Sequence, residues 1–392
     1  MLKRHGSAMR RDTILKRHGS EMRRDKKRHR SSLSVELELL PHDVIELILE
    51  RLPVESLRRF RSVSKKWRST IDSPRFQERQ LKLRRQSRGH DLLFVAYHED
   101  PPDDVAPLVL GSSCIFRTVK FPFPNLLLCY GSCDGLVCLF CMYSPNVVVN
   151  PATRWHRSFP FSSVQRLIVD RYYKEPFAGP TTELGFGKDK LSGTYKPVWL
   201  YNSFEFGLDN VTTCEVFDFS TDSWRYVVPA SPYRILKFQK PVYFDGSLYW
   251  LTDCVETKVL SFDLHTETFQ VLCKTPFADA PHQKDVILFI LDNRLCASEK
   301  RWPTQVIWSL DSSKTWKKMF SIDLTKTYPW FERCALVPLP VAILEKNKLY
   351  LHGREYLEPL VLHDLHTKSY EVVSTPTTPG DCIYYFESLF SV

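Results

Sequence analysis

The chain has 392 residues, 43% of them hydrophobic and 13% aromatic, which is enough for two or three globular domains. Its net charge of +9 resides in residues 1–30, which hold 12 Lys and Arg against 3 Asp and Glu; subtracting them leaves 42 of each sign. The neutral remainder argues against a folded nucleic-acid-binding domain. No run of about eighteen apolar residues is present to span a membrane, and no secretory leader is visible. The 11 scattered cysteines lack a disulfide framework, so we expect reduced thiols and an intracellular location, in the nucleus, the cytoplasm or both.

Residues 1–33 are expected to form a disordered basic arm, because their charge density opposes collapse. Residues 2–12 and 15–25 are near-identical, but this repeat is too short and too polar to build a fold. The basic run 26–30 fits nuclear import or attachment to an anionic surface, and a duplicated segment without a role explains it equally well.

Residues 34–85 are predicted to form a small module of short helices. Apolar residues at 44, 45, 48, 49 and 52 follow the spacing of a helical stripe. Pro41 suits the first turn of that helix, Pro53 ends it, and Ser73-Pro74 suits the start of the last helix. So small a unit carries more apolar positions than it can bury, and this surplus indicates a partner.

The motifs in this module are Leu40-Pro41-x-Asp43-Val44, Ile48-Leu49-x-x-Leu52-Pro53-x-x-Ser56-Leu57 and Val63-Ser64-Lys65-x-Trp67. Their combination resembles an F-box, the module that docks on the Skp-type adaptor of cullin–RING (SCF) ubiquitin ligases. The alternative is an ordinary helical subdomain packed on the rest of the chain. The resemblance implies that one set of residues is buried partly against the adaptor and partly in the module's own core. Periodicity alone does not show which residue does which. The set is Leu40, Pro41, Val44, Ile45, Ile48, Leu49, Leu52, Pro53 and Leu57.

Residues 86–90 are predicted to be a linker, and residues 91–392 an all-β domain. One repeated element is a turn followed by a strand, and it begins at Asp134, Asp245, Asp292 and Lys346. The other is a strand, a turn and a strand, with turns near Asn150, Asp218, Asp263, Leu310 and Asp364; its last four members are 45, 47 and 54 residues apart. A period near fifty with two hairpins per unit predicts a kelch-like β-propeller of about six four-stranded blades.

Three details of this domain are predicted from the repeat. The Asp, Asn and Thr side chains should bond the backbone of their own turns, and the aromatic that follows should pack between blades. Gly185-Phe186-Gly187 and Gly193 are expected to mark turns of a more divergent unit. The segment 382–390 is expected to be a strand that closes the ring by pairing with an early strand, since an unpaired apolar edge invites aggregation.

The all-β domain contains Gly131-Ser132-Cys133-Asp134-Gly135-Leu136-Val137-Cys138, Asn150-Pro151-Ala152-Thr153, and Gly185-Phe186-Gly187 with Tyr195-Lys196. On these motifs, residues 90–392 resemble the F-box-associated domain of plant F-box proteins. The chain is therefore expected to be multidomain, with a small all-α F-box module followed by an all-β propeller.

The sequence predicts no catalytic residue, metal site or cofactor. Nucleophile-elbow, zinc-protease, P-loop and dinucleotide motifs are absent. Cys129, Cys133, Cys138 and Cys141 lie close together, but Cys138 and Cys141 are expected on opposite faces of a strand, as core thiols. His265, His363 and His366 lie at or beside the repeated turns and are expected to be solvated.

Loop segments that interrupt the repeat are the predicted recognition sites, because exposed aromatics and Arg anchor interfaces. These candidate residues are Phe204, Phe206, Trp302, Tyr328, Trp330 and Phe331. The function that follows is a non-catalytic substrate receptor, joined through a Skp-type adaptor to cullin and a RING protein, that holds a target protein for ubiquitination. Two alternatives stay open: a propeller lectin or glycoside-processing enzyme with an unrelated helical cap, and a nucleic-acid-binding protein driven by the basic arm.

Overall fold

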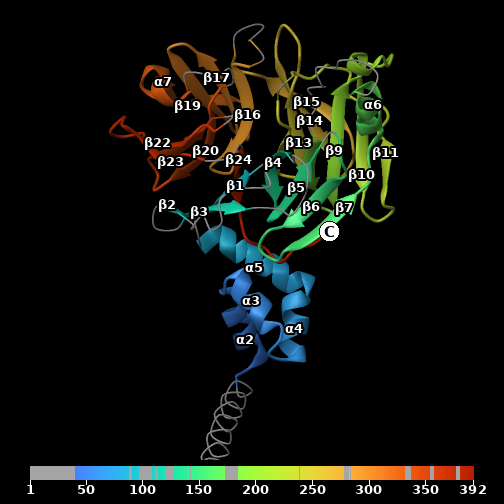
Figure 1. Cartoon of the computed structure of the whole chain (residues 1–392), viewed down its shortest axis with the longest axis vertical. Coiled ribbons are helices and arrows are strands. Elements are labelled where there is room, and N and C mark those ends of the chain that lie inside the picture. The colour runs from blue at the N-terminus through green and yellow to red at the C-terminus, as the bar shows by residue number, and fades with distance from the viewer. Residues whose placement is uncertain are drawn as a thin grey trace, which may run out of the picture. The chain divides into compact units, whose positions relative to one another are not determined.

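The structure is a computed structural model that describes residues 40–87, 91–96, 108–110, 114–119, 128–141, 143–172, 184–237, 239–277, 282, 284–331, 337–353, 357–376 and 380–392. The basic arm 1–33 lies outside these residues. The chain divides into two compact units, with the boundary between Arg79 and Gln80 (Figure 1). No helix of the described residues is both long and apolar enough to cross a bilayer.

The first unit consists of short helices whose ends match the predicted signals. They are α2 (His42–Glu50), α3 (Val54–Phe60), α4 (Lys65–Asp72) and the first part of α5 (Pro74–Ser87). The Ser64 hydroxyl caps α4 by accepting the Trp67 N–H at 3.1 Å, and the Ser73 hydroxyl accepts the Phe76 N–H at 3.3 Å. Helix α5 crosses the boundary between the units and extends two residues into the range 86–90 where a linker was expected.

The core of the first unit is small. It is built from Ile45, Leu49, Val54, Leu57, Ile71 and Phe76, each at most 6% exposed. The Phe60 and Trp67 rings meet edge to face, with centroids 5.4 Å apart. Arg79 pairs with Glu50 at 2.9 Å and with Glu46 at 3.3 Å, which joins the first part of α5 to α2.

The second unit is a six-bladed β-propeller, as predicted (Figure 1). Each blade is a four-stranded sheet, and blades 2 to 6 are each built from four consecutive antiparallel strands. Blade 2 is β4–β7 (Leu128–Cys133, Leu136–Phe140, Asn146–Asn150, Trp155–Phe159), blade 3 is β8–β11 (Leu184–Lys188, Tyr195–Asn202, Thr212–Asp218, Ser223–Tyr226), blade 4 is β12–β15 (Val242–Phe244, Ser247–Leu251, Lys258–Asp263, Phe269–Lys274), blade 5 is β16–β19 (Val286–Leu291, Arg294–Arg301, Thr304–Leu310, Trp316–Asp323) and blade 6 is β20–β23 (Leu339–Leu344, Lys348–His352, Leu360–Asp364, Tyr370–Ser374).

Blade 1 closes the ring with strands from both ends of the propeller sequence. Its order is β2 (Leu108–Leu110), β3 (Cys114–Val119), β1 (Asp91–Ala96) and β24 (Gly380–Tyr385). Strand β24 pairs antiparallel with β1, Leu93 opposite Ile383, while β3 lies parallel to β1. The innermost strands β24, β4, β8, β12, β16 and β20 contact one another in that order around the axis. The predicted closure by the C-terminal strand is thus confirmed.

The closing strand is shorter than expected, because it ends at Tyr385. The following residues are held by a side chain of blade 2 instead of by a ladder. The buried Asn150 amide donates to the carbonyl oxygens of Ser388 at 3.0 Å and Phe390 at 2.9 Å. Its carboxamide oxygen also accepts the backbone N–H groups of Ala152 and Thr153. One Asn therefore shapes its own turn and anchors the end of the chain.

The predicted turn chemistry recurs around the ring. The Asp263 carboxylate accepts the backbone N–H groups of His265 and Thr266, both at 2.8 Å, and Glu267 follows in the left-handed region at a φ of 55°. Equivalent bonds are accepted by Asn150, Asp218, Asp311 and Asp364. The turns between the first two strands of blades 2 and 4, Asp134-Gly135 and Asp245-Gly246, have positive φ at both positions, as tight hairpins require.

The aromatic after each such turn packs between blades, as predicted. The Trp224 indole N–H of blade 3 donates to the Pro160 carbonyl oxygen at the end of blade 2, at 2.7 Å. Trp316 of blade 5 makes the same 2.7 Å bond to Lys274 at the end of blade 4. These bonds tie the outer strands of neighbouring blades together.

Two sequence-based expectations were wrong. Gly185 and Gly187 do not mark turns but lie in strand β8, where a Cβ atom on Gly187 would stand 2.3 Å from the Tyr243 ring of the next blade. His363 is not solvated; it is 1% exposed in β22 and stacks on Tyr370 with centroids 4.1 Å apart. Both departures arise because blade strands are covered on two faces, which local turn signals do not report.

Replacing Gly187 by Ala is expected to destabilise the propeller by about 1–3 kcal/mol, because the new methyl overpacks the contact with blade 4. The Tyr243 ring has little freedom to yield, since its hydroxyl donates to the Lys188 carbonyl oxygen at 3.0 Å. Thermal unfolding followed by circular dichroism measures the loss. Gly131→Ala is the matched control, because a Cβ there meets nothing within 4 Å. Equal unfolding temperatures for the two variants would refute the packing argument.

Candidate interaction surfaces

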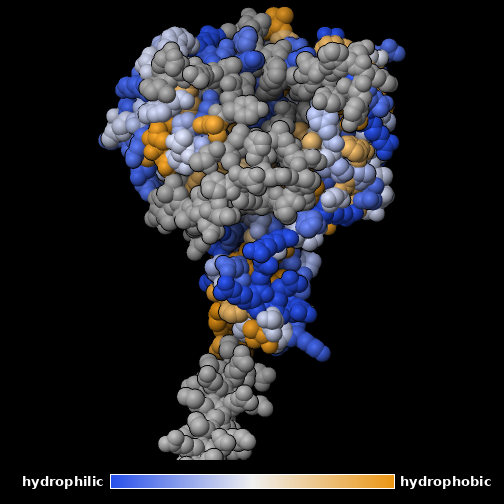
Figure 2. Space-filling model, viewed as in Figure 1, coloured by the Kyte–Doolittle hydropathy of each residue, from blue (hydrophilic) through white to orange (hydrophobic). Residues whose placement is uncertain are grey.

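An apolar surface on the first unit is exposed to solvent. It consists of Leu40 (41% exposed), Leu47 (42%), Ile48 (48%) and Val63 (57%). Figure 2 shows hydrophobic atoms gathered over the α2 end of this unit. We call these four residues the helical apolar surface. Four large apolar side chains left in water on so small a unit are typical of a surface that another protein covers.

The structure divides the predicted adaptor-binding residues by burial. Leu40, Pro41 and Ile48 are exposed, Val44, Leu52 and Pro53 are half-buried, and Ile45, Leu49 and Leu57 form the unit's own core. Ile45 and Leu49 are four residues apart and share the inner face of α2, which turns Ile48 outward. Leu47 and Val63 were not among the predicted residues. The sequence feature that could have identified them is the number of apolar residues in this module, which exceeds what one helical stripe needs.

The connections between blade strands emerge at two opposite ends of the propeller. In blades 2 to 6, one end carries the tight turns between strands one and two and between strands three and four. The other end, here called the connection face, carries α6 (Ser163–Tyr172), the 3₁₀ turn η1 (Ser203–Phe206) and α7 (Leu324–Phe331). Figure 1 shows α6 and α7 at one end of the strands and the C terminus at the other.

All six predicted recognition residues belong to connections of this one face, although they come from blades 3 and 5. Phe204 is 49% exposed and Trp302 is 64% exposed. Phe206 instead packs edge to face on Tyr201 at 5.1 Å, and Trp330 and Phe331 pack into the core between blades 5 and 6. The side chain of Tyr328 lies outside the described residues.

The connection face also carries most of the exposed large apolar side chains of the described propeller. Besides Phe204 and Trp302, these are Tyr143, Leu167, Leu208, Val211, Val228, Val255 and Leu357. On the turn face, Leu191 is the exposed large apolar side chain among the described residues, at 77% exposed. This asymmetry favours the connection face as the binding surface of the propeller.

The four clustered thiols are core groups of blade 2. Cys133 and Cys138 lie in one hydrophobic cluster, and Cys129 and Cys141 lie in another. Burial raises the pKa of Cys129 to about 12 and that of Cys138 well above its ordinary value. Among the described residues, no group of three or more His, Cys, Asp or Glu side chains is placed to hold a metal ion.

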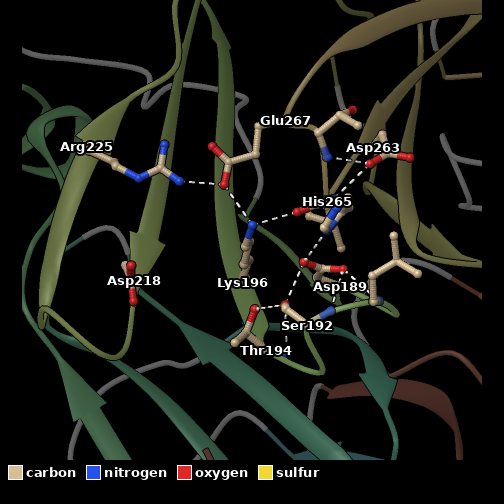
Figure 3. Close-up of polar contacts among 12 residues, drawn as sticks. Asp189, Ser192, Thr194, Lys196, Asp218, Arg225, Asp263, His265 and Glu267 are labelled. Atoms are coloured by element: carbon tan, nitrogen blue, oxygen red, sulfur yellow. Dashed lines mark hydrogen bonds and ion pairs between the residues drawn. The ribbon is translucent and has the colours of Figure 1, made fainter.

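A polar cluster on the turn face joins blades 3 and 4 (Figure 3). Glu267 of blade 4 pairs with Arg225 and, at 2.7 Å, with Lys196 of blade 3. The Lys196 ammonium also donates to the Leu264 carbonyl oxygen at 2.6 Å. Burial disfavours the charged form of Glu267, yet the hydrogen bonds from Arg225 and Lys196 win and hold its pKa below the usual range.

The same cluster contains a serine, a histidine and an aspartate, and its geometry decides whether they form a nucleophilic triad. The Ser192 hydroxyl donates to the Asp189 carboxylate at 2.6 Å, and His265 Nδ1 contacts the same oxygen at 3.1 Å. In a hydrolase triad the histidine lies between the serine and the carboxylate, so that it removes the serine proton. Here the carboxylate lies in the middle, and neither the serine nor the histidine activates the other.

The cluster therefore connects blades 3 and 4 through hydrogen bonds and ion pairs. Burial of Asp189 opposes its ionisation, but the hydrogen bonds from Ser192, His265 and two backbone N–H groups keep its pKa below the usual range. The histidine comes from blade 4 and the carboxylate from blade 3, so their contact adds to the Glu267 pairs.

Glu267→Gln is expected to destabilise the propeller at pH 7.5 and to have less effect in acid. A carboxyl whose pKa is lowered by folding stabilises the fold above its ordinary value of 4.5. This stabilisation is lost as the pH falls below that value, because the unfolded state then binds a proton that the folded state resists. Unfolding temperatures measured at pH 7.5, 5.5 and 3.5 test this. Glu256→Gln is the control: Glu256 pairs with Lys274 in the open, where pairs contribute little. A difference that persists undiminished at pH 3.5 would contradict the assignment.

The comparisons with known proteins agree with this architecture. The F-box domain family matches residues 37–79, and the F-box associated beta-propeller domain family matches residues 127–392, which is more than half of the chain. The chain thus belongs to the family of F-box proteins with an F-box associated β-propeller.

Relatives in Arabidopsis thaliana share most of the chain. The protein described as "F-box protein At1g11270" is 60% identical over 287 residues, covering 73% of this chain and 91% of the relative. "F-box protein At2g34280" is 49% identical over 394 residues, covering 91% of this chain and all of the relative. "F-box/LRR-repeat/kelch-repeat protein At1g09650" is 49% identical over 380 residues, covering 91% and 97%.

Proposed function

We propose that this protein is the substrate receptor of an SCF-type ubiquitin ligase. The helical unit would dock on a Skp-type adaptor, and through it on cullin and a RING protein, while the propeller would hold the target. The observation that carries the proposal is the helical apolar surface of Leu40, Leu47, Ile48 and Val63, which the unit leaves in water. Membership of the F-box family supports a Skp-type adaptor as the partner that would cover it.

The receptor would contribute no chemistry of its own. Its role would be to raise the effective concentration of the target near the ubiquitin-carrying enzyme of the ligase. The Asp189, Ser192 and His265 arrangement gives no support to a hydrolase triad, since His265 contacts the carboxylate and not the serine hydroxyl. The same proposal includes an intracellular location, in the nucleus, the cytoplasm or both. It also includes the division of the chain into an arm 1–33, a module 34–85, a linker 86–90 and a propeller 91–392.

Ile48→Asp in the full-length chain is expected to weaken binding to a purified Skp-type adaptor by about thirtyfold or more, the effect of losing an interface hot spot. The exposed Ile48 can accept the carboxylate without unfolding the unit, whereas Leu49→Asp would bury a charge in its core. Calorimetric titration gives the affinity, and circular dichroism verifies folding.

Val255→Asp serves as the matched control for this experiment. Val255 is 72% exposed on the connection face, so the same change of charge there should leave adaptor binding intact. Undiminished binding by a folded Ile48→Asp chain would refute the assigned docking surface. Failure of the unaltered chain to bind any Skp-type adaptor would refute the proposed function itself.

A further inference from the structure

One place on the connection face combines an exposed aromatic ring with exposed positive charge. The Phe204 ring, 49% exposed, lies under the Arg234 guanidinium at 4.6 Å and the Lys237 ammonium at 5.6 Å from its centroid. We call Phe204, Arg234 and Lys237 the cationic aromatic site. Arginine and aromatic side chains are the types that most often dominate the energetics of protein interfaces.

The members of the site come from two separate connections of blade 3, and buried hydrogen bonds tie the backbones of these connections together. Asn202, which precedes η1, is 4% exposed. Its amide donates to the Ile235 carbonyl oxygen at 2.9 Å and accepts the Ile235 N–H at 2.9 Å. Because Ile235 follows Arg234, these two bonds fix the backbone from which the Arg234 side chain reaches the ring. A site supported by buried hydrogen bonds loses less entropy on binding than a mobile loop does.

The positively charged side chains at the site differ in whether they already have hydrogen-bond or ion-pair partners. Lys237 pairs with the Glu205 carboxylate at 3.3 Å, and Arg171 donates to the Glu205 backbone carbonyl. Arg234 is exposed, and within the described residues no carboxylate pairs with its guanidinium. Asp253 lies beside Arg234, because its backbone N–H donates to the Arg234 carbonyl oxygen at 2.8 Å. Among the described residues its carboxylate forms no ion pair with Arg234, so the guanidinium is available to a ligand.

Exposed apolar side chains belong to the same two connections as this charge. Leu208 (38% exposed) and Val211 (46%) belong to the same connection as Phe204, and Val228 (87%) precedes Arg234 in the next one. The two connections are tied by the bond from the Thr212 hydroxyl to the Ser231 carbonyl oxygen. A ligand that fits must therefore offer negative charge beside apolar surface.

We propose that the cationic aromatic site binds an acidic segment of the target protein, in which an Asp or Glu stands next to a large apolar residue. The target carboxylate would accept two parallel hydrogen bonds from Arg234, and its neighbour would pack on Phe204, Leu208 and Val211. A single uncommitted guanidinium matches the single charge of a carboxylate better than the near-double charge of a phosphoserine. This inference deepens the proposed function and rests on it.

The test uses the full-length chain and a degenerate library of nine-residue peptides on beads, with a second library that carries phosphoserine at a fixed position. The unaltered chain is expected to enrich Asp or Glu about tenfold over Asn or Gln at one position, beside Leu, Ile or Phe, since a charge-assisted bond is worth about a factor of ten. Arg234→Glu should reverse this preference toward Lys and Arg. Phe204→Ala should remove the apolar preference.

Arg166→Glu is the matched control, because Arg166 is exposed on α6 of the same face and should leave the selection unchanged. Unfolding temperatures verify that each variant is folded, and Arg234→Gln replaces Arg234→Glu if the latter is not. Selection of phosphoserine peptides alone, selection unaffected at Arg234, or no enrichment at all would each overturn the inference. Adaptor binding by the unaltered chain, measured separately, shows whether the proposed function survives such a result.

Discussion

Closure of the ring by β24 is the constraint on which the second unit depends. Strand β24 completes the innermost layer, in which each inner strand contacts the next, and its pairing with β1 removes the two edges that an open propeller would present. Asn150 continues the closure beyond the strand by anchoring Ser388 and Phe390. The closed ring carries the two connections of blade 3 from which Phe204 and Arg234 come.

The two ends of the strands have different tasks. At the turn face, polar side chains form internal hydrogen bonds and ion pairs that stabilise the fold. Asp263 accepts hydrogen bonds from its own turn, and Glu267 and Asp189 connect neighbouring blades. At the connection face, longer segments carry exposed apolar groups and an uncommitted guanidinium. A polar cluster that contains Ser, His and Asp therefore turns out to be a structural joint, and a site of two cations and a ring is the better candidate for recognition.

The features that could be predicted from the sequence are those determined locally. The Asp or Asn turns and the aromatic residues after them recur in blades 2 to 6 because short-range hydrogen bonds select similar residues in each, and their spacing predicts about six blades. Helical spacing grouped Ile45 with Leu49 but did not show which face of α2 is covered, so Leu47 was missed. His363 was misplaced because a strand between two blades is buried on both faces. The contact of Phe204 with Arg234 joins two connections that are bonded through Asn202 and Ile235, and no sequence periodicity reports such a contact.

Blade 1 also determines what a shortened chain would do. A product that ends before Gly380 keeps every residue of the helical unit but lacks the strand that completes the innermost layer. During synthesis the ring likewise stays incomplete until β24 has left the ribosome. On the proposed function, a truncated product would occupy the adaptor without holding a target, and would act as a competitor of the intact receptor.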